Sequence, residues 1–136
     1  MSPGYWVKRL EEVPLVPTDD PADFEWYPLQ HHFGLSAFGI NVFGGERGIE
    51  LVAEHDETES GQEEVYVVLA GAARLTLAAE EVDVAAISVV VVKDPAVRRA
   101  ATSIAAGTLL LALGGRPGSF ATTWRPQNFE RVPVAD

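Results

Sequence analysis

The sequence of 136 residues contains no cysteine, which excludes disulfide bridges, thiolate metal sites and cysteine nucleophiles. Basic residues are also scarce, because ten Lys and Arg stand against twenty Asp and Glu and leave a net charge of -10. Such a chain repels phosphate backbones and anionic lipids, so we expect neither nucleic acid nor a membrane as a partner. Apolar runs such as Ile87–Val92 are too short to span a bilayer, and the N-terminus has no apolar signal-peptide core. A cytoplasmic location is therefore expected.

Three sequence motifs of common enzyme classes are also absent. The chain has no glycine-rich phosphate loop, no serine nucleophile elbow with a Ser-His-Asp order, and no His-Glu-x-x-His zinc motif. The enzyme classes that depend on these motifs are excluded.

Short apolar segments separated by turn residues dominate the rest of the sequence. Hydrophobic residues make up 47% of the chain and charged residues 22%, which is typical of one globular domain at this length. No segment has a convincing amphipathic helical pattern. We expect strands at residues 36–43, 64–69, 74–77, 82–84, 87–92, 98–104 and 108–113, with a further strand that ends at residue 57. This spacing predicts an all-β barrel or sandwich.

Two irregular segments flank the predicted barrel, which spans residues 36–115. Residues 1–35 form an N-terminal arm in which five prolines exclude a long helix or a central strand: Pro3, Pro14, Pro17, Pro21 and Pro28. The arm is rich in aromatic residues, so we expect it to pack on its own barrel or on a second subunit. Residues 116–136 form a C-terminal tail, and we expect Trp124 and Phe129 to anchor this tail on the barrel.

The stretch GIELVAEHDETESGQEEVYVVLAG, residues 48–71, carries the best candidates for chemistry. Successive side chains of a strand point to opposite faces, so alternation places His55 and Glu57 on one face of the first strand. Glu64 and Tyr66 share a face of the second strand in the same way. If the two faces line one interior, an imidazole and two carboxylates converge there.

Such a group needs a compensating charge when it is buried. A divalent metal held by His55, Glu57 and Glu64 would supply that charge, and a mixed set of nitrogen and oxygen ligands suits Mn, Fe or Zn. The alternative is a polar network without metal, which Arg98 or Arg99 and water would satisfy.

The same stretch resembles the first motif of the cupins, a family of small barrels of the double-stranded β-helix type. In that motif a glutamate is followed after six residues by a glycine, as Glu64 is by Gly71, and HDE at 55–57 stands where the family has His-x-His. Three more segments recur in small single-domain cupins: AFGIN at 37–41, DPAVRR at 94–99 and GTLLLALGGRPG at 107–118. The resemblance implies a cupin, or jelly-roll, barrel. The metal motif of this chain is partly degenerate, since Glu57 replaces the second histidine and the fourth ligand of the family is missing.

Further polar residues are candidate ligand contacts. If residues 98–104 form a strand, alternation sends either Arg98 or Arg99 inward, to neutralise a carboxylate of the cluster or to clamp a substrate carboxylate. Tyr66 either donates its hydroxyl to a ligand or packs in the core with that hydroxyl hydrogen-bonded. Asn41, in the AFGIN segment, is also expected at the ligand site.

A pair of histidines, His31 and His32, precedes the first core strand. Adjacent residues of an extended chain cannot both face one site. We expect a surface pair in a loop, or one histidine that reaches the barrel mouth.

The resemblance implies a barrel that binds a small organic molecule. The protein would be a metal-dependent enzyme of the dioxygenase or isomerase type, or a ligand-binding or sensing protein that works without metal. Fold alone does not decide between these two classes. We also expect a homodimer, formed through the proline-rich arm or an outer strand.

Overall fold

A computed structural model describes residues 4–136, so Pro3 of the arm lies outside the described residues. The described chain contains nine strands: β1 (Glu25–Tyr27), β2 (Gly39–Gly45), β3 (Glu50–His55), β4 (Glu63–Ala70), β5 (Ala72–Leu77), β6 (Glu80–Ala85), β7 (Ser88–Val92), β8 (Arg99–Ser103) and β9 (Thr108–Gly115). Three short helical segments accompany them: the 3-10 helices η1 (Leu10–Glu12) and η2 (Pro126–Phe129), and the α-helix α1 (Leu29–His32). The prediction of an all-β protein is confirmed.

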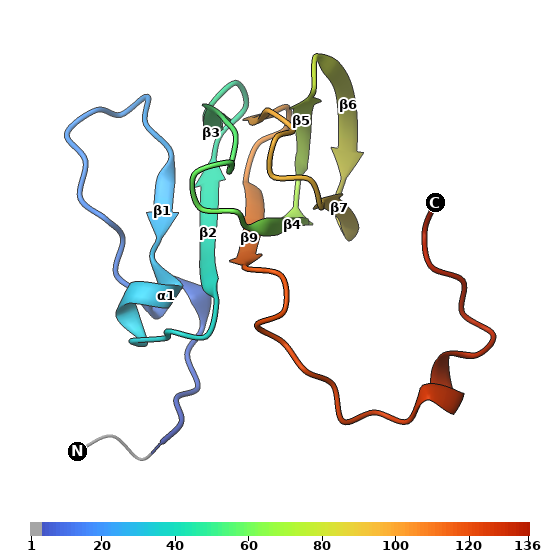
Figure 1. Cartoon of the computed structure of the whole chain (residues 1–136). Coiled ribbons are helices and arrows are strands. Elements are labelled where there is room, and N and C mark those ends of the chain that lie inside the picture. Colours follow the sequence, from blue (N-terminus) through green and yellow to red (C-terminus); the bar gives the residue numbers. More distant parts are fainter. Residues whose placement is uncertain (1–3) are drawn as a thin grey trace.

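The strands form two antiparallel sheets (Figure 1). One sheet has the order β1-β2-β9-β4-β7, and the other has the order β3-β8-β5-β6. The neighbours in each sheet are mostly distant in sequence; β2, for example, pairs with β9 over its whole length. Two sheets of this kind make the jelly-roll barrel that the resemblance implies.

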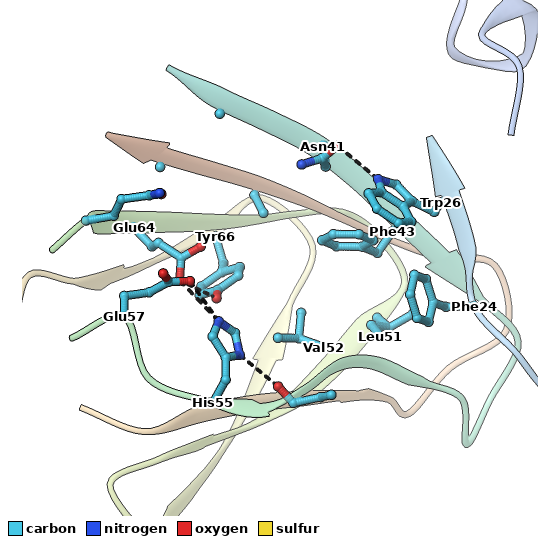
Figure 2. Close-up of a pocket in the computed structure, with 15 residues that line it drawn as sticks. Phe24, Trp26, Asn41, Phe43, Leu51, Val52, His55, Glu57, Glu64 and Tyr66 are labelled. Carbon is cyan, nitrogen blue, oxygen red and sulfur yellow. Dashed lines mark hydrogen bonds and ion pairs between the residues drawn. The ribbon is translucent and has the colours of Figure 1, made fainter. Parts of the chain in front are cut away.

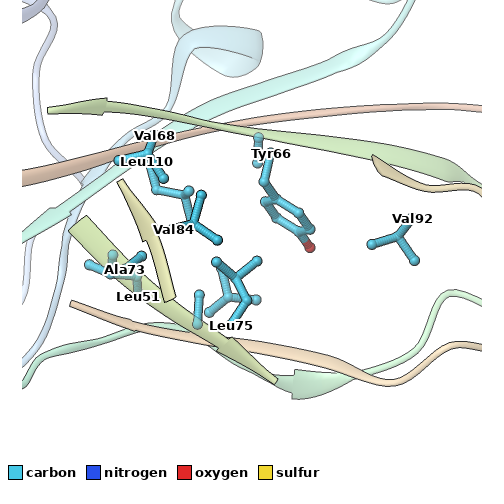
Figure 3. Packing of buried hydrophobic residues seen from close by; sticks show 11 residues of the cluster. Leu51, Tyr66, Val68, Ala73, Leu75, Val84, Val92 and Leu110 are labelled. Atoms are coloured by element: carbon cyan, nitrogen blue, oxygen red, sulfur yellow. The ribbon is translucent and has the colours of Figure 1, made fainter. Parts of the chain in front are cut away.

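The hydrophobic core lies between the two sheets (Figure 3). In β9, buried residues alternate with half-buried ones from Thr108 to Ala112, as expected for a strand with one face in the core. Leu110 of β9, Val68 of β4 and Ala73 of β5 have no exposed surface. Both sheets therefore contribute to one continuous core.

The arm packs on its own barrel, which was one of the two alternatives for it. Its strand β1 adds to the edge of the five-stranded sheet by pairing with β2. The amide of Val16 donates to the carbonyl oxygen of Trp26 at 3.0 Å, and Val13 is buried. The prolines are compatible with this arrangement because a short edge strand leaves one row of amides unused.

The C-terminal tail does not show the anchoring that we expected from Trp124 and Phe129. Every residue from 116 to 136 is exposed. The two rings lie 6.1 Å apart, centroid to centroid, and Phe120 lies 6.2 Å from Trp124, so the tail aromatics contact one another. Pro117 and Pro126 lack the amide that would extend the sheet, which helps to explain why the tail adds no strand after β9.

No helix of residues 4–136 is long and apolar enough to cross a membrane.

The turn between β5 and β6 gives a stability prediction. Its two residues, Ala78 and Ala79, have φ values of 51° and 83°, which suit Asn and Gly better than alanine. Left-handed backbone costs an L-residue roughly 1–2 kcal/mol. The double substitution Ala78→Asn with Ala79→Gly is therefore expected to raise the free energy of unfolding by about 1–2 kcal/mol, measured by urea denaturation.

The matched control is Ala86→Gly in the next turn, where the alanine does not have a positive φ. Glycine only increases the entropy of the unfolded chain there, so stability should fall by about 0.5–1 kcal/mol. A double variant that loses stability as the control does would contradict the strain argument.

Candidate functional site

A cavity of about 400 Å³ opens between the two sheets (Figure 2). This volume falls in the range of small-molecule sites. Three aromatic side chains form one end of its lining: Phe24, Trp26 and Phe43. The other end is polar, where Figure 2 shows His55, Glu57 and Glu64 turned toward one another.

His55 reaches the cavity from a strand that does not alternate regularly. The pairing of β3 with β8 shifts register between Glu50 and Val52 and again between Val52 and His55. As a result Leu51 and Val52, which are neighbours, are both buried. Such bulges commonly re-aim side chains beside functional sites. The simple alternation that we used to place His55 therefore does not hold along this strand.

Glu57 is not on the strand, contrary to the prediction, because β3 ends at His55. It belongs to the loop between β3 and β4. The Glu57 amide donates to the carbonyl oxygen of Pro95 at 2.8 Å, and the Glu57 carbonyl accepts from the Gly61 amide at 2.7 Å. These backbone bonds fix the loop so that the Glu57 side chain turns back into the cavity.

The three candidate ligands nevertheless converge, as the sequence predicted. His55 Nε2 lies 3.0 Å from Glu57 Oε1 and 3.9 Å from Glu64 Oε1. One ligand atom from each residue can be chosen so that all three lie within 4.8 Å of one another. The hydroxyl of Ser60 donates to Glu57 Oε2 at 2.5 Å and holds that carboxylate in place.

The hydrogen bond made by Nδ1 of His55 determines which ring nitrogen carries the proton. His55 Nδ1 lies 2.8 Å from the carbonyl oxygen of Ala53, so Nδ1 carries a proton and donates. In the neutral ring, Nε2 then has a lone pair directed at the carboxylates of Glu57 and Glu64. Lone pairs that face each other at these distances repel, so a positive charge is required between them. A proton on Nε2 or a metal cation meets this requirement, and both fit the donor set.

Arg99 is the arginine that points inward. It is 1% exposed, and its Nη1 donates to Glu64 Oε1 at 2.5 Å. Its remaining nitrogens donate to backbone carbonyls, among them that of Val97 at 2.8 Å and 3.0 Å. The internal ion pair is therefore formed, and the guanidinium is already fully hydrogen-bonded beneath the cavity wall.

Arg98 lies on the outside of the barrel. Its guanidinium lies 3.5 Å from Glu54 and 3.6 Å from Asp56, and the side chain is more than half exposed. Neither arginine lines the cavity, and no Lys or Arg of residues 4–136 does. Their predicted role in ligand binding would therefore be indirect, through Glu64 for Arg99.

Tyr66 is buried and donates its hydroxyl proton to Glu64 Oε1 at 2.9 Å. Burial, with a smaller contribution from the nearby Glu64 charge, raises the pKa of the Tyr66 phenol far above its usual value. The hydroxyl therefore stays protonated and acts as a donor. Asn41 also lines the cavity, where its side-chain oxygen accepts from the Trp26 indole at 2.9 Å.

The histidine pair lies on α1, not in a loop. His31 is exposed, and His32 Nε2 lies 2.7 Å from Lys8 Nζ. Neither residue lines the cavity or belongs to the metal-type cluster. These positions agree with the expectation that the two histidines form a surface pair.

The aromatic end of the cavity was missed by the sequence reasoning. Phe24 and Trp26 belong to the arm, and β1 brings Trp26 opposite Phe43 of β2. Phe24 and Phe43 meet edge to face with ring centroids 5.4 Å apart. The spacing of Phe24 and Trp26, two residues apart, is a strand signal that the surrounding prolines obscured.

No family model and no curated protein sequence matches this chain. Solved structures do match its fold. A cupin protein from Bacteroides fragilis aligns with a TM-score of 0.63 and 16% identity over 81% of this chain and 91% of that protein. A predicted oxalate decarboxylase from Thermotoga maritima aligns with a TM-score of 0.65 and 14% identity, over 80% of this chain and 97% of the other.

A third match is a sugar phosphate isomerase of the cupin superfamily from Silicibacter pomeroyi, with a TM-score of 0.63 and 19% identity over 79% of this chain and 74% of that protein. At these identities the similarity establishes the fold and not the activity. The chain has the fold of a small cupin domain.

Proposed function

We propose that this protein binds a small organic molecule in the cavity between its sheets, beside a divalent metal ion held by His55, Glu57 and Glu64. The observation that carries the proposal is the direction of the imidazole. Because Nδ1 donates to Ala53, the Nε2 lone pair faces two carboxylates, and a divalent cation satisfies all three groups at once. Nitrogen and oxygen ligands of this kind suit Mn, Fe or Zn.

The residues around the cluster support the same arrangement. The Ala53 carbonyl fixes the imidazole, and the Ser60 hydroxyl fixes Glu57. Arg99 and Tyr66 both donate to Glu64 Oε1 and hold that carboxylate in place. Outer contacts of this type orient metal ligands. A bound metal would polarise an oxygen atom of the ligand as a Lewis acid.

The aromatic end of the cavity would take the apolar part of the ligand. Phe24, Trp26 and Phe43 offer ring surfaces for packing there. Asn41 and Tyr66 lie between this end and the cluster. As an enzyme, the protein would be of the dioxygenase or isomerase type, and a relative in fold is described as a sugar phosphate isomerase.

A second candidate function is ligand binding without metal. It is favoured by the ion pair of Arg99 with Glu64, which already neutralises one carboxylate of the cluster. A proton on His55 would then pair with Glu57, and the protein would carry or sense its ligand.

Replacement of Glu57 by glutamine separates the two functions. With metal, the variant loses an anionic ligand, so metal measured by elemental analysis should fall well below that of the wild type. Metal stabilises the folded state by about 2.7 kcal/mol at a concentration of 100 times its dissociation constant. Chelator should therefore lower the melting temperature of the wild type and leave that of Glu57→Gln unchanged.

Glu59→Gln is the matched control, because Glu59 lies in the same loop and is exposed. It should keep the metal and the response to chelator. If the wild type, purified without chelator or a nickel column, holds no metal and ignores added Mn, Fe and Zn, the metal proposal is wrong and the binding function is the one supported.

A further inference from the structure

The five-stranded sheet has an apolar surface on the side that faces away from the core. Residues opposite each other in neighbouring strands share a face. Strand pairing sets six such side chains in two rows, which we call the outer face: Val91, Val65 and Leu113 in one row, and Val89, Val67 and Leu111 in the next. The rows cross β7, β4 and β9.

The outer face is covered at one end and open at the other. Val42 of β2 continues the second row beyond Leu111 and is 2% exposed. At the other end of the rows, Val89 and Val91 are 62% and 63% exposed. They lie on β7, an edge strand that pairs only with β4. A contiguous apolar surface of this kind marks an interaction site.

The tail of the same chain carries exposed apolar groups. Its first residues stay near its own barrel, since Arg116 donates to the Ser60 carbonyl oxygen at 3.1 Å and Phe120 borders a surface cavity with Val65 and Leu113 of the outer face. Figure 1 shows the rest of the tail curving away from the sheets. Phe120, Trp124 and Phe129 are 74%, 63% and 47% exposed. The ring contacts of Trp124 are with the other two tail aromatics.

The charges of the tail and the barrel are complementary. Residues 116–136 contain three arginines and two acidic residues, whereas residues 1–115 contain seven basic and eighteen acidic residues. By side-chain charge the tail is net +1, whereas residues 1–115 are net -11. These opposite signs favour contact between a tail and a barrel, although two whole chains repel each other.

We infer that the tail of one chain packs on the outer face of a second copy, and that the second tail packs on the first. Both surfaces belong to every chain, so the exchange closes as a two-fold dimer. Three aromatic side chains bury roughly 150–250 Å² each, so two tails and the sheet surface beneath them exceed the roughly 1,200 Å² of a stable interface. This dimer is independent of the proposed ligand function and replaces the arm as the dimer contact.

Light scattering on the full chain over a dilution series tests the inference. The wild type should have twice the mass of one chain. A tail variant, Phe120→Ser with Trp124→Ser, and a face variant, Val89→Lys with Val91→Lys, should each dimerise about tenfold more weakly or worse. All four residues are exposed in the single chain, so both variants should keep the circular dichroism spectrum of the wild type.

The control is Val7→Lys, because Val7 is 90% exposed but lies on the arm. This variant should dimerise as the wild type does. An equal loss in the control would show that any added charge disrupts the dimer, and the assignment of the outer face would be overturned.

Mixing the two variants distinguishes exchange from a tail that folds back on its own barrel. In the mixed dimer, the intact tail of the face variant meets the intact sheet of the tail variant, so the mixture should associate more tightly than either variant alone. A mixture no tighter than its components would overturn the exchange. A monomeric wild type would overturn the dimer and leave the outer face to another protein.

Discussion

Replacement of Arg99 by methionine is expected to lower the free energy of unfolding by about 3–5 kcal/mol, because it leaves a buried carboxylate without its counter-charge. The Arg99 side chain is 1% exposed and that of Glu64 is 12% exposed, with 2.5 Å between Nη1 and Oε1. Methionine keeps the length and apolar stem of the side chain, so the change removes mainly the charge and its hydrogen bonds. Urea denaturation measures the loss.

The neighbouring arginine provides the control. The Arg98 side chain is 55% exposed and pairs with Glu54 and Asp56 at 3.5 Å and 3.6 Å, a surface arrangement that contributes at most about 1 kcal/mol. Arg98→Met should therefore be nearly neutral. If the two variants lose the same stability, the ion pair of Arg99 with Glu64 is not a main stabilising contact.

The Arg99 variant also reports on the proposed metal. A divalent cation bound at Glu64 would neutralise the carboxylate that Arg99→Met leaves unpaired. Added Mn or Zn should then recover part of the lost stability. Recovery should be absent when Glu57→Gln is combined with the Arg99 change, because one of the three proposed ligands is then weakened.

The second large effect is expected at Gly71, between β4 and β5. Its φ is +71°, and a Cβ there would lie 2.8 Å from Thr108 Cα and also against Thr108 Oγ1. Thr108 is fully buried and bonds to the backbone of Ala72 and Ala105, so it cannot move aside. Gly71→Ala should lower the free energy of unfolding by roughly 2–5 kcal/mol, from left-handed strain together with overpacking.

Substitution of Gly107 separates the contribution of left-handed strain from that of overpacking. It also has a positive φ, +65°, but no atom lies within 4 Å of a Cβ built on it. Gly107→Ala should therefore lose only the strain, roughly 1–2 kcal/mol. A Gly71 variant no less stable than the Gly107 variant, in a thermal or urea titration, would show that the barrel relaxes around the added methyl group.

Local patterns in the sequence determined the strand composition and much of the site. Alternation and turn residues predicted the strands, since a half-buried strand has a period of two. Alternation placed Glu64 and Tyr66 on one face, and the six-residue spacing of Glu64 and Gly71 carried the resemblance to the cupins. The convergence of His55, Glu57 and Glu64 also followed from the sequence, although β3 reaches it through register shifts and Glu57 through a loop.

Other parts of the site depend on contacts between segments far apart in the chain. Whether Arg98 or Arg99 points inward depends on the pairing of β8 with β3, and adjacent residues give no local signal for it. The aromatic wall forms because β1 joins β2, and the prolines around β1 hide this pairing in the sequence.

The sequence alone thus determined an all-β barrel with a polar cluster that needs a positive charge. The tertiary structure decided which arginine neutralises that cluster, which aromatic residues line the cavity, and that the arm covers its own barrel while the tail does not. The physical reason is that the burial of a residue depends on how the strands assemble into sheets. A residue's face follows from its strand, but its neighbours follow from strand order and register, which local propensities do not encode.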